Sequence, residues 1–216
     1  MTKRKAQSTK RNQDGNAGVR QNNMNAIVAV YSDWGIGYNG RQTIVIPEDR
    51  KRFRELTTGG VVVAGRKTYE ELRMSLPNRR NIVLTRDREF TALKADVAHS
   101  VAEVLALVAD DDPGRVFVIG GGEIYSLFLS ICSFAYVTKI NAFPMSDTFF
   151  PNLDEMPEWS HKSKSEIRES ENRESGNRKS DTENQKSETG VEYSFMLYRN
   201  NCMQQLIEKE TYLFKR

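Results

Sequence analysis

The sequence VFVIGGGEIY, residues 116–125, places three consecutive glycines directly after a run of branched apolar residues. Residues 116–119 predict a strand that is buried on both faces, because apolar and polar side chains do not alternate there. The residues after the glycines are apolar at helical spacing and predict a helix. A glycine turn between a strand and a helix leaves backbone N–H groups free to bind an anion. A tight turn without a ligand explains this single motif equally well.

Length and composition predict one domain with polar segments outside its core. The chain has 216 residues, of which 38% are hydrophobic, and its formal net charge of +3 is too small to indicate a nucleic-acid partner. No apolar run is long enough to span a bilayer, and the N-terminal residues lack the apolar core of a signal peptide. The two cysteines, Cys132 and Cys202, then predict a reduced protein of the cytoplasm with no membrane partner. We expect no metal site.

Three segments are predicted to lie outside the packed domain. Residues 1–23 contain six Lys or Arg and a single acid, and they predict a disordered basic extension; a solvated tail is favoured over an arm that binds phosphate. Residues 160–190 contain seven Lys or Arg, seven Asp or Glu and one large aliphatic residue, and they predict a disordered insertion with no catalytic part. The domain is therefore expected at residues 24–199, and a C-terminal extension at residues 200–216.

Strands and helices alternate between these segments. Pro47 suits the first turn of a helix, and Ser100 with Glu103 forms a capping box at the start of another. Apolar strands separated by helices predict a mainly parallel sheet that is covered on both faces. Strands are predicted at residues 25–31, 61–64, 81–85, 116–119, 134–141 and 191–198, and helices at residues 48–57, 67–73, 100–109 and 121–129.

Two more strand ends carry groups that bind phosphate. The sequence AGRKT, residues 64–68, places two cations and a hydroxyl at the start of a helix, and Thr85 with Arg86 ends the strand NIVLTR. Each arginine alone is explained by a solvated surface charge. Because the carboxyl ends of parallel strands share one edge of a sheet, the three strand ends together predict a site for a phosphorylated dinucleotide.

The sequence IPEDRKRF, residues 46–53, contains a candidate acid. Asp49 falls in the first turn of a predicted helix, and Phe53 lies one turn later on the same face. An acid that faces inward is desolvated, which raises its pKa and suits proton transfer. An acid that is favoured there by the helix dipole explains the position as well, and Glu48 fits that role equally.

Seven motifs follow one another along residues 25–159, and their order and spacing resemble those of the dihydrofolate reductase family. They are AIVAVYSDWGIGYNG, IPED, AGRKTYEEL, LPNRRNIVLT, VIGGGEIY, YVTKI and SDTFFP, with further similarity at residues 191–199. The resemblance is to bacterial members, and it implies a three-layer α/β fold whose mostly parallel eight-stranded sheet is flanked by helices and has an antiparallel last strand. It also implies NADPH-dependent reduction of 7,8-dihydrofolate to 5,6,7,8-tetrahydrofolate, with hydride transfer to C6.

The resemblance assigns roles to the candidate residues of the substrate site. Asp49 matches the carboxylate that binds the pterin and assists protonation of N5, and Thr138 supports the pterin end through Asp49 or through a bridging water. Phe53 matches the residue that packs on the p-aminobenzoyl ring, and Arg79 matches the residue that binds the glutamate α-carboxylate. The implied substrate-binding residues are Ile27, Ala29, Asp49, Phe53, Arg79 and Thr138.

The cofactor site implied by the resemblance lies along the glycine junctions. Arg66 and Arg86 match residues that bind the 2′-phosphate of NADPH, the three glycines match the pyrophosphate site, and Tyr125 matches a neighbour of the nicotinamide. The implied partners are dihydrofolate and antifolates such as trimethoprim or methotrexate, and a monomer is expected. The implied cofactor-binding residues are Ala29, Ile36, Gly37, Gly65, Arg66, Lys67, Thr68, Thr85, Arg86, Ile119, Gly120, Gly121, Gly122, Glu123, Ile124 and Tyr125, of which Gly37 begins a mobile loop over the site.

Two positions depart from the pattern of the family. Ile44 stands where the family commonly has a tryptophan that holds a water near the pterin, and Arg50 stands where many relatives have Leu or Met. Neither change removes the acid, so a dihydrofolate reductase is the leading hypothesis. The alternatives are a reductase of another pterin or an aminopyrimidine, against which Asp49 and Arg79 argue, and a folate- and NADPH-binding paralogue with little turnover.

Overall fold

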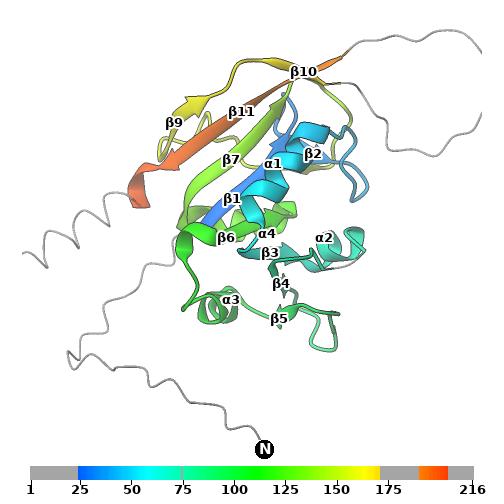
Figure 1. Ribbon diagram of the computed structural model, residues 1–216, viewed down its shortest axis with the longest axis vertical. Coiled ribbons are helices and arrows are strands. Elements are labelled where there is room, and N and C mark those ends of the chain that lie inside the picture. Colours follow the sequence, from blue (N-terminus) through cyan, green and yellow to red (C-terminus); the bar gives the residue numbers. More distant parts are fainter. Residues whose placement is uncertain (1–23, 74, 171–189, 204–216) are drawn as a thin grey trace, which may run out of the picture.

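One large sheet forms the centre of the computed structural model, which describes residues 24–73, 75–170 and 190–203 (Figure 1). Within these residues the sheet has nine strands in the order β10-β11-β7-β1-β6-β3-β4-β5, and β9 also pairs with β11. Because β9 and β10 lie along successive parts of the same edge of β11, the sheet is eight strands wide. The strands are β1 (Met24–Val30), β3 (Val61–Gly65), β4 (Arg80–Leu84), β5 (Asp96–Ala98), β6 (Val116–Gly120), β7 (Cys132–Ile140), β9 (Trp159–Lys164), β10 (Arg168–Ser170) and β11 (Val191–Asn200).

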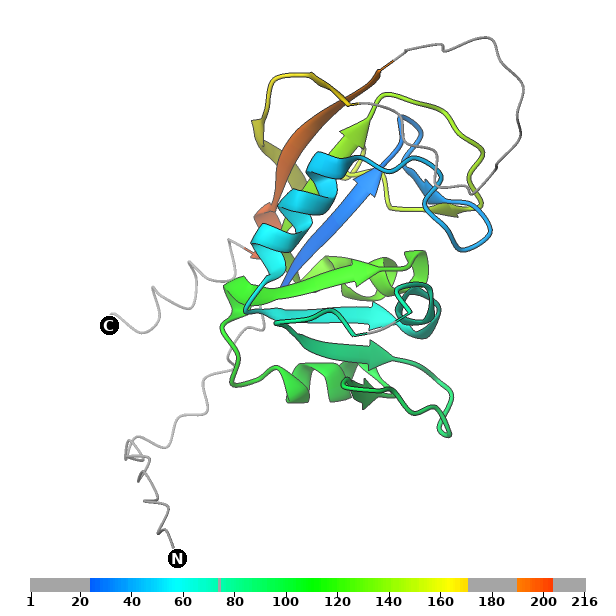
Figure 2. The ribbon, with the colours of Figure 1, turned by 45° about the vertical axis from the view of Figure 1, so that its right-hand side comes forward.

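The pairing confirms the predicted topology. The strands from β7 across to β5 are mutually parallel, and β11 runs antiparallel to β7. Every residue of β3, with the sequence VVVAG, is buried, as its continuous apolar run predicts. The parallel order places the carboxyl ends of β6, β3 and β4 side by side at one edge of the sheet, which Figure 2 shows from a second side.

The helices begin where the sequence predicts. Pro47 lies in the first turn of α1 (Pro47–Thr57), and the Ser100 hydroxyl accepts a hydrogen bond from the Glu103 N–H at the start of α3 (Val101–Leu107). The Glu103 carboxylate accepts from the N–H of His99, one residue earlier than in the usual capping box. The remaining helices are α2 (Arg66–Glu71), α4 (Gly122–Phe128) and the 3₁₀ turns η1 (Pro113–Arg115) and η2 (Leu129–Ile131). In Figures 1 and 2, α1 crosses in front of β1 and α4 lies behind β6.

A second, two-stranded ribbon joins two loops at the carboxyl end of the sheet. It consists of β2 (Gly35–Gly37) and β8 (Thr148–Phe149). The N–H of Asp147 donates to the Gly37 carbonyl at 3.0 Å, and the Asp147 carboxylate accepts from the N–H of Asn39 at 2.8 Å. The ribbon therefore ties the loop after β1 to the loop after β7.

The prediction that residues 160–190 form a disordered insertion is wrong for its first part. Residues 160–164 belong to β9 and residues 168–170 to β10, and both strands pair antiparallel with β11. An edge strand gains its stability from backbone hydrogen bonds to one neighbour, so a polar sequence is compatible with it. The predicted start of the C-terminal extension at residue 200 is also wrong, because Asn200 still belongs to β11 and both Asn200 and Met203 are buried. Residues 171–189 lie outside the described residues, as do the predicted extension at residues 1–23 and residues 204–216.

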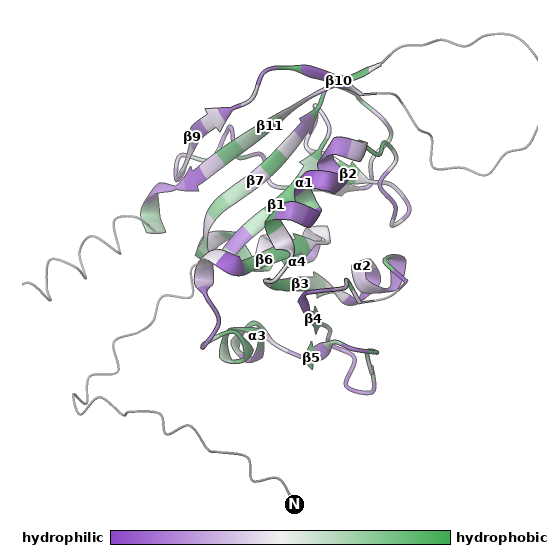
Figure 3. Cartoon of the chain, viewed as in Figure 1, coloured by the Kyte–Doolittle hydropathy of each residue, from purple (hydrophilic) through white to green (hydrophobic). Residues whose placement is uncertain are grey.

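The core is formed by two apolar clusters. The larger one packs the sheet against α3 and α4, and it includes Phe128, Val104 and Trp159. The smaller one surrounds Tyr31 and Tyr193 near the start of α1, and Figure 3 shows how the apolar residues concentrate in the strands. Among the residues that the structure describes, no helix is long and apolar enough to cross a membrane, and no group of His, Cys, Asp and Glu side chains could hold a metal ion.

Candidate active site

The three glycines after β6 allow the backbone to pass very close to neighbouring parts of the protein. Gly120 has φ +121°, a conformation that side chains other than glycine rarely adopt, and a cis peptide bond joins it to Gly121. A Cβ on Gly121 would lie 3.3 Å from the Thr68 hydroxyl, and one on Gly122 would lie 2.9 Å from the Thr148 side chain. The glycines thus bring the turn before α4 against the first turn of α2, so the two glycine junctions form one surface.

The predicted phosphate-binding cations lie at this edge and are paired with carboxylates. Arg66, after β3, makes an ion pair of 3.0 Å with Glu70. Arg86, after β4, lies 3.8 Å from Glu123 of α4, and both side chains are almost fully exposed. The exposed ion pairs are weak. An anionic ligand with several oxygens can therefore replace the carboxylates without a large penalty.

Tyr125 connects α4 to the central strand. Its hydroxyl donates a hydrogen bond of 2.8 Å to the Ile27 carbonyl, and its ring packs against Phe150 with centroids 4.8 Å apart. Burial raises the pKa of Tyr125 far above its ordinary value, so the hydroxyl stays protonated. The contact fixes the part of β1 that leads to Ala29, which is half-buried and lies opposite Thr138 in β7.

Asp49 is the inward-facing acid of α1. The Thr138 hydroxyl donates a hydrogen bond of 2.5 Å to its Oδ1. Of the two routes from Thr138 to the pterin end that the resemblance left open, the structure therefore contains the contact through Asp49. Burial raises the pKa of Asp49 above its ordinary value, and the Thr138 hydrogen bond, Arg52 and Arg50 act in the opposite direction. Glu48 faces outward and accepts a hydrogen bond of 2.9 Å from the Ser170 hydroxyl. The structure therefore assigns the inward position to Asp49 and not to Glu48.

Arg79 and Phe53 lie together at the other end of α1. The Arg79 guanidinium carbon is 5.7 Å from the centre of the Phe53 ring, and its Nε is buried without a hydrogen-bonding partner in the described structure. Burial, and next the charge of Arg54, lowers the pKa of Arg79. An arginine that lacks a carboxylate partner and stands beside an aromatic ring is suited to bind an aromatic ligand with an acidic tail.

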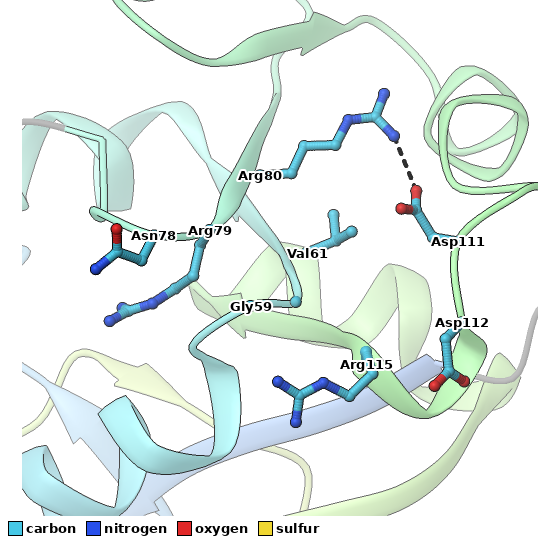
Figure 4. Close-up of a pocket in the computed structure, with 9 residues that line it drawn as sticks. Gly59, Val61, Asn78, Arg79, Arg80, Asp111, Asp112 and Arg115 are labelled. Atoms are coloured by element: carbon cyan, nitrogen blue, oxygen red, sulfur yellow. Dashed lines mark hydrogen bonds and ion pairs between the residues drawn. The ribbon is translucent and has the colours of Figure 1, made fainter.

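Arg79 also lines a pocket of about 290 Å³, together with the next residue, Arg80 (Figure 4). The two arginines differ in their interaction partners. Arg80 points to Asp111 and forms ion pairs of 2.8 Å with Asp111 and with Asp96. Arg79 points away from both Arg80 and Asp111. Of these two adjacent arginines, only Arg79 is without a carboxylate partner among the described residues. The other lining residues are Gly59, Gly60, Val61, Asn78, Asp112 and Arg115.

The two positions that depart from the family pattern differ in their surroundings. Ile44 is partly buried in the smaller apolar cluster, and Arg50 is exposed. The buried hydroxyl of Tyr31 accepts hydrogen bonds from the N–H groups of Thr43 and Ile44, at 2.8 and 3.0 Å. Tyr31 therefore fixes the backbone that leads into α1, and no sequence motif indicated this.

Sequence reasoning also missed Arg52. This residue lies one turn after Asp49, and its guanidinium packs on rings of β7 and β11. The helical spacing from Asp49 could have identified it, since residues three apart share a face of a helix. The remaining predicted cofactor residues lie at the ends of strands, in β2, or in the first turns of α2 and α4. Examples are Gly65 and Ile119 in the last residues of β3 and β6, Thr85 directly after β4, Ile36 in β2 and Lys67 in α2.

Comparison with known proteins finds the same family in sequence and in structure. The family model described as dihydrofolate reductase matches residues 23–189. A dihydrofolate reductase of Staphylococcus aureus (strain MSSA476) is 38% identical over 116 residues, which cover 54% of this chain and 70% of that protein. One of Staphylococcus haemolyticus is 38% identical over 117 residues, covering 53% and 69%. The structure of a dihydrofolate reductase from Enterococcus faecalis, complexed with NADP(H) and RAB-propyl, superposes with a TM-score of 0.67 at 30% identity and covers 84% of this chain and 98% of that one.

Proposed function

Because this chain belongs to the dihydrofolate reductase family and reduces dihydrofolate with NADPH, we propose that Asp49 is its proton-transferring acid. The observation that carries the proposal is the position of Asp49, which faces inward, is partly buried and accepts a hydrogen bond from Thr138. Its carboxylate binds the pterin and assists protonation of N5. Burial favours the neutral form of the acid, which suits the group to proton transfer.

The residues at the carboxyl edge of the sheet fit NADPH. A Cβ at Gly121 would meet the first turn of α2 and one at Gly122 would meet β8, and Arg66 and Arg86 provide two cations at this edge. When bound, NADPH supplies the hydride that reaches C6 of the pterin. The backbone at the glycines holds the pyrophosphate, the two arginines bind the 2′-phosphate, and Ala29 with Tyr125 positions the nicotinamide end beside β1.

We assign the tail of the substrate to Phe53 and Arg79. The Phe53 ring packs on the p-aminobenzoyl group, and the Arg79 guanidinium binds the glutamate α-carboxylate. The unpaired Nε of Arg79 supports this assignment, because a buried donor without a partner destabilises the protein until a ligand accepts its hydrogen bond. We propose that the site formed by Asp49, Phe53 and Arg79 also accommodates antifolates with a pteridine or diaminopyrimidine ring, including methotrexate and trimethoprim.

We further propose that the enzyme is a monomer of the cytoplasm. Both cysteines are free, which suits a reducing compartment. Light scattering coupled to size-exclusion chromatography measures the oligomeric state, and a mass of two chains in solution contradicts the proposal.

The proposed role of Asp49 is tested by the variant Asp49→Asn. Asparagine preserves the shape of the side chain but cannot hold the proton or make the charge-assisted contact to the pterin. We expect NADPH oxidation on addition of dihydrofolate to fall by about a hundredfold or more at pH 7, in line with the usual contribution of a general acid. The affinity for NADPH, measured by fluorescence titration, changes less than about twofold.

A methotrexate-inhibited sample gives the background rate for this assay. Near wild-type turnover by Asp49→Asn at pH 7 removes Asp49 from the proposed role. Turnover of other pterins, with none of dihydrofolate, by the wild-type protein identifies a different substrate.

A further inference from the structure

A second charged side chain of α1, Arg52, lies between the helix and the sheet. Its guanidinium carbon is 4.4 Å from the centre of the Phe195 ring in β11 and 5.8 Å from that of Tyr136 in β7. The side chain is half-buried, and among the described residues its guanidinium has no hydrogen-bonding or ion-pair partner. Arg168 of β10 also lies over the Phe195 ring, at 5.7 Å, so two cations contact the same ring.

Packing alone does not explain a guanidinium at this position. Partial removal of a cation from water is unfavourable, and burial accordingly lowers the pKa of Arg52, against the charge of Asp49. Contacts with two aromatic rings offset part of this penalty. An aliphatic or aromatic side chain would fill the same space between α1, β7 and β11 without it. The charge therefore calls for a separate explanation.

Asp49 is the carboxylate that this charge affects. The groups that face Asp49 are Arg50 and Arg52 on its own helix, the Thr138 hydroxyl on β7, and two neutral phenols, Tyr125 of α4 and Tyr193 of β11. Thr138 and the two arginines favour the ionised carboxylate, whereas burial favours the neutral acid. Arg50 is exposed, so water and salt screen its charge more than that of Arg52.

Resting on the proposed role of Asp49, we propose that Arg52 is a positioning residue that favours the ionised form of Asp49 and thereby sets the pH range of the reaction. Arg52 acts through Asp49 and through the rings of Phe195 and Tyr136 that hold its guanidinium in place. A nearby cation lowers the pKa of any neighbouring acid, whether this is Asp49 or the protonated N5 of the bound pterin. The loss of Arg52 therefore extends hydride transfer to higher pH.

The test measures the rate of hydride transfer in a single turnover between pH 5 and pH 9.5. An isotope effect with deuterated NADPH verifies that the measured rate is that of hydride transfer. The variants are Arg52→Gln, Arg52→Met, which keeps an unbranched apolar stem, and Arg52→Lys, which keeps the charge. The matched control is Lys51→Gln, which removes one positive charge from the exposed face of the same helix. We expect the ratio of the Arg52→Gln rate to the wild-type rate to be about threefold higher, or more, at pH 9 than at pH 6.

The conservative and control variants define the other outcomes. Arg52→Lys retains the wild-type pH profile within error, and Lys51→Gln shows a constant ratio across the pH range. A pH-independent ratio for either neutral variant that folds overturns the proposal, and so does an Arg52→Lys profile shifted as far as that of Arg52→Gln. If Asp49→Asn retains hydride transfer, the assignment of Asp49 itself is wrong; if Asp49→Asn is inactive and the Arg52 profiles do not move, only the role of Arg52 is wrong.

Discussion

The direction in which one side chain points separates Asp49 from its neighbour Glu48. Both acids occupy the first turn of α1, where the helix dipole favours negative charge. Asp49 faces Thr138 in β7 and is partly shielded from water, whereas the exposed Glu48 reaches the Ser170 hydroxyl at the edge of the sheet. Desolvation in the first environment raises the pKa of Asp49, which suits this carboxyl group to proton transfer.

At the same scale, Arg66 is expected to select NADPH over NADH. A charge-assisted contact with the 2′-phosphate contributes ~1.5–3 kcal/mol, so Arg66→Ala lowers the ratio of kcat/KM for NADPH to that for NADH by about tenfold. Arg86→Ala has a smaller effect, because the Arg86 side chain is 93% exposed and its charge is screened. Steady-state kinetics with both cofactors measures the ratios.

The control for this prediction is Arg88→Ala, which removes an exposed arginine from the loop that carries Arg86. We expect its cofactor ratio to equal that of the wild-type enzyme. An unchanged ratio in the Arg66→Ala, Arg86→Ala double variant contradicts the assignment of the 2′-phosphate site.

At the scale of elements, the edge formed by β9 and β10 supports the substrate side of the molecule. Both strands pair with β11, and Ser170 at the end of β10 holds Glu48 in the helix that carries Asp49. Gly190 packs against Glu169 and Ser170, so the two ends of the segment 171–189 lie next to each other. A short connection can therefore join β10 to β11.

We predict that replacement of residues 171–189 by a short Gly/Ser linker leaves kcat and KM within about twofold of wild type. Closing a shorter loop is slightly more favourable, by ~0.6 kcal/mol for each halving of its length, so the free energy of unfolding stays equal or rises. Replacement of residues 160–189 removes most of β9 and all of β10, and it lowers both kcat and Tm. Thermal unfolding and steady-state kinetics of the two variants test this; equal behaviour of both contradicts it.

The accuracy of sequence prediction differed between long apolar strands and short polar ones. The run VVVAG and the run before the glycines predicted β3 and β6 to within one residue, because continuous apolar residues have few other stable arrangements. The strands β2, β8 and β10 have two or three residues each and form through backbone pairing with a partner far along the chain, which no local pattern indicates. Likewise, the family motifs predicted Asp49 and Arg79 as site residues. The contacts of Arg52 with β7 and β11, and of the Tyr31 hydroxyl with the backbone of residues 43 and 44, depend on the folded chain and have no local sequence signal.

At the scale of the whole molecule, burial of Asp49 affects stability as well as activity. A carboxyl group whose pKa is higher in the folded than in the unfolded protein binds protons more tightly in the folded state. The folded state therefore loses stability as the pH rises above the pKa of Asp49 in the unfolded protein, near 3.8. The loss continues until the pH exceeds the pKa of Asp49 in the folded protein. At neutral pH Asp49 therefore lowers the stability of the folded state.

Asp49→Asn is therefore expected to raise the Tm at pH 7 in the absence of ligands. Asparagine can still accept the Thr138 hydrogen bond but carries no charge to desolvate. The difference in Tm from wild type should shrink as the pH falls through and below 3.8, where the carboxyl group becomes protonated in both states. Scanning calorimetry from below this pH to pH 8 measures it; parallel Tm curves for the two proteins contradict the expected linkage.

The central place of β1 in the sheet has a consequence for how the protein is made. Asn25 pairs with Phe117 of β6, and Ala26 pairs with Ala135 of β7, so the first strand has no partner close to it in sequence. During synthesis β1 leaves the ribosome well before β6 and β7 are translated, and its apolar residues stay unpaired in that interval. Contacts between such distant segments form slowly, because a long chain must first be closed into a loop. We conclude that the sheet is assembled late in synthesis, when β7 has joined β1 and β11 can close over its outer side.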